Sequence, residues 1–83
     1  MTNLEIYLKN LHYPFRTVQR SKGEKEIIIY DNDFDQKRYS IHIYSTPFSL
    51  GGEDYKYIFW DYKEKIQRLG KTEFDMLKEM GVL

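Results

Sequence analysis

The sequence predicts an α+β fold: an antiparallel four- or five-stranded β-meander with an N-terminal helix and one or two C-terminal helices packed on one face. Three segments between residues 26 and 62 concentrate β-branched and aromatic residues, and turn residues separate them, which is typical of neighbouring strands. Near both ends of the chain, a threonine precedes an acidic residue by three positions, which indicates helix starts. Because the connections between strands are short, we expect adjacent strands to pair antiparallel.

The N-terminal helix is predicted by a capping box and an apolar stripe. Thr2 can accept a hydrogen bond from the backbone of Glu5, whose carboxylate can reach back to the start of the helix. Residues spaced i, i+3, i+4 and i+7 form the stripe that we expect to be buried: Leu4, Tyr7, Leu8 and Leu11. Glu5 and Lys9 are expected to pair on the outer face, and Pro14 to end the helix.

Three strands are expected in the first half of the chain. Residues 15–20 have the pattern of a short strand, and Gly23 suits the turn that follows it. Residues 27–29 are all isoleucine, apolar on both sides, which predicts a strand placed centrally in the sheet. A turn over residues 31–35 leads to residues 37–45, where large apolar and polar side chains alternate as in a half-buried strand.

The next connection is the longest stretch for which the sequence indicates no regular structure. Residues 46–54 contain Pro47 and the pair Gly51-Gly52, and we expect an irregular, flexible loop there. Residues 55–61 then predict a strand with aromatic or apolar side chains on both faces.

Residues 62–70 fit two structures. Asp61 and Glu64 can form a capping box, and Gly70 follows the last turn, which favours a helix. Alternatively, residues 66–69 form a last strand that pairs with the aromatic strand before it. We expect the helix and keep the strand as the alternative.

A C-terminal helix is predicted from the N-cap Thr72 to Gly81. Its expected buried stripe consists of Phe74, Leu77 and Met80. The order of a helix, an antiparallel sheet and a C-terminal helix resembles that of double-stranded-RNA-binding domains. Those domains present a lysine cluster at the start of the last helix, where this chain has Glu73 and Asp75 and only Lys78 further on. The resemblance is therefore limited to the order of the elements.

Composition limits the classes of protein that the chain can belong to. Its 83 residues make one small domain, and an aromatic content of 17% compensates for the small number of core positions. The absence of cysteine excludes disulfides, thiolate metal sites and thiol catalysis. The first twenty residues contain no long apolar run, so we expect no signal peptide and no membrane span, and a cytoplasmic location.

Charge is balanced overall but sorted along the chain. Thirteen basic and thirteen acidic residues give a net charge of zero, which argues against nucleic-acid binding over the whole surface. All the charged residues from 6 to 23 are basic, whereas those from 24 to 35 are mainly acidic. A basic edge beside an acidic loop is one pattern of a partner-docking surface.

Two features of the sequence bear on metal binding. Residues 31–35 resemble the start of a calcium-binding loop, because carboxylates alternate there. The pattern fails further on, where Gln36 replaces the required glycine and His42 replaces the bidentate glutamate. His12 and His42 also lack the neighbouring ligands that a zinc site needs. We therefore expect no metal and no cofactor.

An acid–base site could form from His42, Arg38 and Tyr44, which are expected to share one strand face. The chain has no nucleophile elbow, and Gly51-Gly52 lacks the following Lys-Ser/Thr of a P-loop. We therefore expect a protein that is not an enzyme.

The strand aromatics outnumber what one small core needs, and a sheet with helices on one face leaves the other face open. We expect this open side to bind a protein through aromatic anchors. The expected partner-binding residues are Arg38, Tyr44, Tyr57, Trp60 and Tyr62, with the 46–54 loop contributing. In this interpretation the chain is a non-catalytic accessory or inhibitor protein, of the kind that phages and mobile elements encode, which occludes a surface of its partner. A homodimer through the same face is a close variant.

The alternative function is that of a nucleic-acid-binding domain that combines basic patches with exposed aromatic rings. The residues expected to contact nucleic acid are Arg16, Arg20, Lys22, Lys25, Lys65, Arg68 and Lys71. Binding of this kind weakens steeply as salt is added, whereas an aromatic protein interface depends on salt far less.

Overall fold

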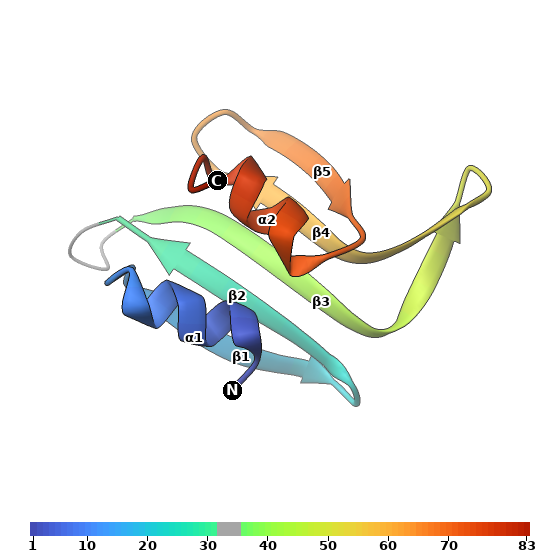
Figure 1. Cartoon of the computed structure of the whole chain (residues 1–83), viewed down its shortest axis with the longest axis horizontal. Coiled ribbons are helices and arrows are strands. Elements are labelled where there is room, and N and C mark those ends of the chain that lie inside the picture. The colour runs from blue at the N-terminus through green and yellow to red at the C-terminus, as the bar shows by residue number, and fades with distance from the viewer. Residues whose placement is uncertain (32–35) are drawn as a thin grey trace.

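The computed structural model describes residues 1–31 and 36–83. Five strands form one antiparallel sheet in chain order, with one helix before the sheet and one after it (Figure 1). The elements are α1 (Asn3–Asn10), β1 (Phe15–Ser21), β2 (Glu24–Tyr30), β3 (Lys37–Leu50), β4 (Glu53–Asp61), β5 (Ile66–Gly70) and α2 (Glu73–Glu79). The predicted α+β meander is confirmed. Most of the predicted turn at residues 31–35, and the calcium-loop pattern with it, lies outside the described residues.

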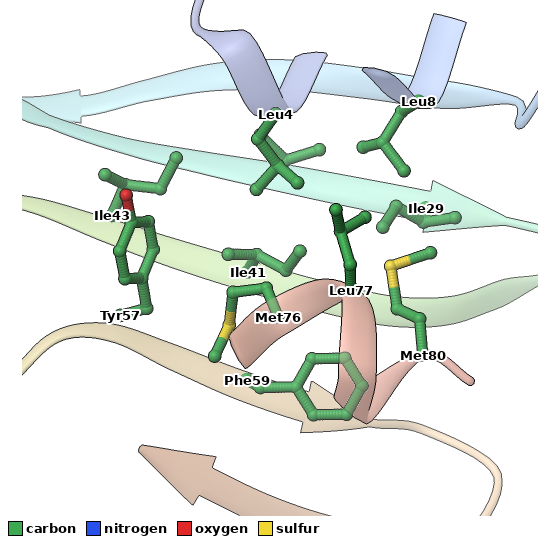
Figure 2. Close-up of a cluster of buried hydrophobic side chains, with 11 residues drawn as sticks. Leu4, Leu8, Ile29, Ile41, Ile43, Tyr57, Phe59, Met76, Leu77 and Met80 are labelled. Atoms are coloured by element: carbon green, nitrogen blue, oxygen red, sulfur yellow. The ribbon is translucent and has the colours of Figure 1, made fainter. Parts of the chain in front are cut away.

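The hydrophobic core lies between the sheet and the two helices, which pack on the same face (Figures 1 and 2). Its buried members are Leu4, Leu8, Ile27, Ile29, Ile41, Ile43, Tyr57, Phe59, Met76, Leu77 and Met80. The strand register aligns them, so that Ile41 of β3 lies opposite both Ile27 of β2 and Phe59 of β4. The predicted position of the isoleucine strand inside the sheet is confirmed, because β2 lies between β1 and β3.

Helix α1 packs on the sheet through fewer side chains than its pattern predicts. Leu4 and Leu8 are buried, but Tyr7 and Leu11 remain 40% and 42% exposed, so that half of the predicted stripe is wrong. Leu11 is the C-cap residue and no longer follows the helical period.

Glu5 takes a position in α1 that the sequence did not indicate. It is buried and faces the sheet, where it contacts Thr17 and Lys25. The predicted pairing of Glu5 with Lys9 on the outer face is therefore wrong. The capping box of Thr2 and Glu5 is confirmed.

Helix α2 begins at the predicted N-cap, where Thr72 and Asp75 form a capping box. The buried residues of this segment are Met76, Leu77 and Met80. Phe74 is 57% exposed, so its predicted place in the core is wrong, because Met76, Leu77 and Met80 form the buried face of this segment and Phe74 lies outside that face. Gly70 allows the close approach of α2, since a Cβ at that position would collide with the end of the Met76 side chain.

The predicted irregular loop at residues 46–54 is wrong, because the two flanking strands continue through it. β3 extends to Leu50 and β4 begins at Glu53. The two residues between them, Gly51-Gly52, both have positive φ, at 61° and 81°, as in a type I′ hairpin turn. We call residues 45–56 the hairpin arm.

The hairpin arm turns away from the rest of the sheet (Figure 1). The bend follows from a bulge between Ile43 and Phe48, where β3 carries more residues than β4 opposite it. On the other edge of the arm, Lys71 holds Glu53 in an ion pair of 2.7 Å, and its ammonium lies 5.6 Å from the centre of the Tyr55 ring.

Residues 62–70 contain a strand, so the expected helix is wrong and the alternative is confirmed. Asp61 does cap this segment, but it caps a turn: its Oδ1 accepts hydrogen bonds from the amides of Lys63 and Glu64, at 2.9 and 3.0 Å. Lys65 then takes a positive φ of 56°, which returns the chain antiparallel to β4.

Neither helix approaches the length that crossing a membrane requires. α1 has eight residues and α2 seven, against about 20 for a bilayer span. Throughout residues 1–31 and 36–83, no helix is both long enough and apolar enough to cross a bilayer.

Candidate functional site

The side of the sheet opposite the two helices, here called the open face, is the candidate site. Side chains alternate along each strand, so the register fixes which residues share this side. One row across β1 to β5 consists of Arg16, Ile28, Ser40, Trp60 and Gln67. The next row consists of Val18, Glu26, His42, Ile58 and Leu69. The open face therefore combines aliphatic, aromatic and polar side chains.

Aromatic rings contact one another at two places on the open face. Trp60 and Tyr62 meet edge to face, with centroids 6.2 Å apart. His42 stacks on Tyr44 at 4.5 Å with nearly parallel rings, and Tyr44 in turn meets Phe48 of the hairpin arm at 5.0 Å. All five rings are half-buried. The ring contacts thus continue from the sheet into the arm.

A network of polar side chains lies among these rings, on β1, β2 and β3. The Glu26 carboxylate accepts hydrogen bonds from Ser40 Oγ at 2.5 Å and from Arg20 Nε at 2.6 Å. The Glu24 carboxylate accepts one from Ser21 Oγ at 2.9 Å and lies 3.1 Å from His42 Nε2. Each carboxylate is therefore paired within the open face.

These contacts keep both carboxylates charged. Burial acts to raise the pKa of Glu26, but the hydrogen bonds from Ser40 and Arg20 outweigh it and lower the pKa overall. The hydrogen bonds from Ser21 and His42 lower the pKa of Glu24. Among the described residues, no buried side-chain nitrogen or oxygen lacks a hydrogen-bond partner.

Three of the five predicted partner-binding residues lie on the open face: Tyr44, Trp60 and Tyr62. Arg38 lies at the end of β3, in an ion pair with Asp61 and with its guanidinium 4.3 Å from the centre of the Tyr39 ring.

Tyr57, the remaining predicted partner-binding residue, does not lie on the open face. It is 6% exposed in the core, under the helices, beside Ile43 (Figure 2). β4 carries large side chains on both faces, so its composition could not indicate which set the helices cover. The alternation along β4 assigns Tyr57 to one face and Trp60 to the other.

The residues predicted to contact nucleic acid divide between the two edges of the sheet. Arg16, Arg20, Lys22 and Lys25 belong to β1, β2 and their turn, whereas Lys65, Arg68 and Lys71 flank or belong to β5. Four of the seven are paired with carboxylates: Arg20 with Glu26, Lys25 with Glu5, Arg68 with Glu79 and Lys71 with Glu53. The structure therefore does not bring them into one basic surface.

The expected acid–base group is also divided. His42 and Tyr44 stack on each other, but Arg38 is engaged with Asp61 at the end of the strand. Within residues 1–31 and 36–83, no three His, Asp or Glu side chains come together as metal ligands.

Sequence reasoning missed Glu24, Glu26 and Ser40, which hold the polar network together. The alternation of β2 and β3 could have placed them on one side, because each lies two residues from another member of the open face. It missed Leu69 because this residue lies on the strand that was expected to be a helix, and Ile58 because the predicted strand over residues 55–61 is aromatic or apolar on both faces.

Large apolar side chains are also exposed away from the open face. Ile6, Tyr7 and Leu11 of the α1 segment are 40–45% exposed, and Phe74 of α2 and Leu50 of the hairpin arm more than half. The first three belong to one short helix and its C-cap, and the other two lie apart on α2 and at the hairpin end, whereas the open face presents side chains in rows that cross all five strands.

A comparison of this chain with protein-family models, with curated proteins and with solved structures finds no match.

Proposed function

We propose that the chain is a non-catalytic protein-binding module whose open face covers a surface of its partner. The observation that carries this proposal is that both carboxylates of the open face are hydrogen-bonded within it. The half-buried Ile58 and Trp60 and the buried Ile28 lie in the same row as Glu26 or in the next one, and Glu24 and Glu26 already have hydrogen-bond partners of their own.

This arrangement suits a surface that loses contact with water. Covering a charged group that has no partner is strongly unfavourable, whereas a paired and hydrogen-bonded group is covered at lower cost. Trp and Tyr side chains supply large contact areas and a polar end, which is why they are frequent anchors at interfaces. Trp60, Tyr62 and Tyr44 are the anchors that we propose.

The size of the open face bears on the kind of complex. Five strands about 4.8 Å apart span roughly 20 Å, and six residues at about 3.3 Å each extend roughly 20 Å along the strands. The resulting area of about 400 Å² is half of the roughly 800 Å² that each partner contributes to a standard interface. We therefore propose that the hairpin arm, whose Phe48 continues the ring contacts, also touches the partner.

We further propose that the chain acts as an accessory or inhibitor protein of the kind that phages and mobile elements encode. Its effect would come from occlusion, because the small sheet covers a surface that its partner needs for another contact. The small size of the chain supports this mode of action.

The proposal is tested by capturing partners on the tagged protein from a lysate of the source cells, with and without nuclease. Trp60→Ala and Tyr44→Ala remove anchors of the open face, and Phe74→Ala removes an exposed aromatic ring from the helix side. We expect one stoichiometric protein that survives nuclease, is lost with the first two variants and is retained with the third. Recovery of nucleic acid alone, or equal loss with all three folded variants, would contradict the proposal.

A further inference from the structure

We propose that the surface of the partner is an apolar patch bordered by carboxylates, that is, an acidic protein surface. This inference rests on the proposed function and adds the chemical nature of the partner. The inference follows from the positions of the charged side chains on the open face, and from which of these side chains already have a partner of opposite charge.

Cations occupy the border of the open face on three sides. Arg16 and Arg20 lie on the edge strand β1, Lys37 lies at the end of the sheet near Tyr62, and Lys56 is the last residue of the hairpin arm, where the arm joins the sheet. Arg16, Arg20 and Lys37 are exposed and Lys56 is half-buried. The β5 side of the open face carries Gln67 and Leu69 instead.

The carboxylates of the open face do not offset this border fully. Glu26 is 14% exposed and is neutralised by Arg20, and Glu24 is paired with Ser21 and His42. In contrast, no carboxylate of the described residues lies within ion-pair distance of Lys37 or Lys56. Among the described residues of the open face, Arg20 offsets Glu26, and Lys37 and Lys56 outnumber Glu24, so that the charge of this described part of the face is positive although the net charge of the chain is zero.

A second copy of the chain fits this border less well. In a symmetric face-to-face dimer, the cationic border of one copy would lie against that of the other, and like charges across an interface oppose association. A partner with glutamate or aspartate around an apolar centre would place opposite charges together instead.

Single-stranded nucleic acid also fits less well. Stacking of bases needs accessible ring faces and cations that follow the phosphate chain. Here Trp60 and Tyr62 are half-buried and meet edge to face, and Glu24 and Glu26 stand between the cations of β1 and Lys56. A phosphate chain that crossed the sheet would meet these two carboxylates.

The test uses three probes in amide-resolved NMR titrations of the ¹⁵N-labelled full chain. Two are blocked hexapeptides with Phe-Leu at the centre, flanked on each side by two glutamates or by two lysines, and the third is an oligothymidylate of eight nucleotides. The double variant Lys37→Glu/Lys56→Glu removes cations of the border. The matched control Lys9→Glu/Lys78→Glu makes the same change of net charge on the two helices.

We expect the glutamate peptide to shift the amides of Ile28, Ile58 and Trp60, with at least tenfold higher affinity than the lysine peptide. The border variant should weaken this binding at least fivefold, and the helix variant less than twofold. Equal weakening by both variants, stronger binding of the oligothymidylate, or no binding of the glutamate peptide would overturn the inference. Equal shifts of the open face by both peptides would overturn the acidic preference alone and leave the proposed binding face standing.

Discussion

The hydroxyl of Thr17, on β1, donates a hydrogen bond of 2.7 Å to the carboxylate of Glu5, on helix α1. Lys25 of β2 forms an ion pair of 3.2 Å with the same carboxylate, and the Thr2 amide donates to it at 2.8 Å. Burial acts to raise the pKa of Glu5, but the hydrogen bonds from Thr2, Thr17 and Lys25 together lower it to about 2. One charged group therefore joins the start of α1 to the first two strands.

Replacing Glu5 with glutamine should destabilise the fold. The glutamine side chain is uncharged and cannot form an ion pair with Lys25, and only its oxygen can accept a hydrogen bond. We expect the free energy of unfolding at pH 7 to fall by about 1–3 kcal/mol, the range for hydrogen bonds to a charged, buried group. Urea denaturation measures the change. Glu64→Gln, in an exposed turn, is the matched control and should change it by less than about 0.5 kcal/mol. Equal effects of the two variants would show that Glu5 does not fasten α1.

The same carboxylate predicts a loss of stability in acid. Its pKa is about 2 in the folded chain against an ordinary value of 4.5, so the unfolded chain takes up the proton first as the pH falls. The stabilisation by the charged carboxylate is complete above pH 4.5 and is lost as the pH falls from there to about 2. Its contribution to the free energy of unfolding is at most about 3 kcal/mol. Urea denaturation at a series of pH values should show the difference between the wild type and Glu5→Gln shrinking over this interval. A difference that stays constant from pH 7 to pH 2 would contradict the assignment.

Most strands could be predicted from the sequence because their patterns are local. In β3, large apolar and polar residues alternate from residue 37 to 45, and only one face of such a strand can enter a core. The three consecutive isoleucines at 27–29 point to both faces of their strand, which likewise predicts a position inside the sheet. Residues 66–69 carry no such restriction, since their few apolar side chains fit a helix or an edge strand equally. Their structure depends on hydrogen bonds to β4, which are tertiary contacts.

The candidate site was predicted only in part for a similar reason. An alternating strand such as β3 fixes the relative faces of His42 and Tyr44, but β4 is apolar on both faces. The sequence therefore does not distinguish Tyr57 from Trp60. The distinction comes from the tertiary structure, in which the helices cover the face of the sheet that carries Tyr57. Glu26 and Ser40 are distant in sequence, and only the pairing of β2 with β3 brings them within hydrogen-bond distance.

The turn of the hairpin arm should distinguish residues by their tolerance of positive φ. Gly51 has a φ of 61°, and a Cβ at this position would meet no other atom within 4 Å, so side-chain size alone does not oppose substitution there. Gly51→Asn should leave the arm intact, because asparagine adopts this conformation readily and Asn-Gly is the preferred type I′ pair. Gly51→Val should strain the turn by about 1–3 kcal/mol. Amide hydrogen exchange in residues 48–56 measures the result, with protection kept in the first variant and lost in the second. Equal protection in both would mean that the turn is not of this type.

The turn between β4 and β5 depends on Asp61, which binds two backbone amides and Arg38 through the same oxygen. Asp61→Ala removes all three contacts and should cost about 2–3 kcal/mol, because the amides of Lys63 and Glu64 lose their acceptor. Asp61→Asn keeps an acceptor for the amides and loses only the ion pair, at a cost of about 1 kcal/mol. Arg38→Gln removes the same ion pair from the other side together with the contact of the guanidinium on the Tyr39 ring, so its cost should equal or slightly exceed that of the asparagine variant. Urea denaturation measures the costs, and amide exchange follows β5, which should lose protection with alanine alone. If all three variants exposed β5 equally, the ion pair rather than the capped turn would be what holds the last strand in the sheet.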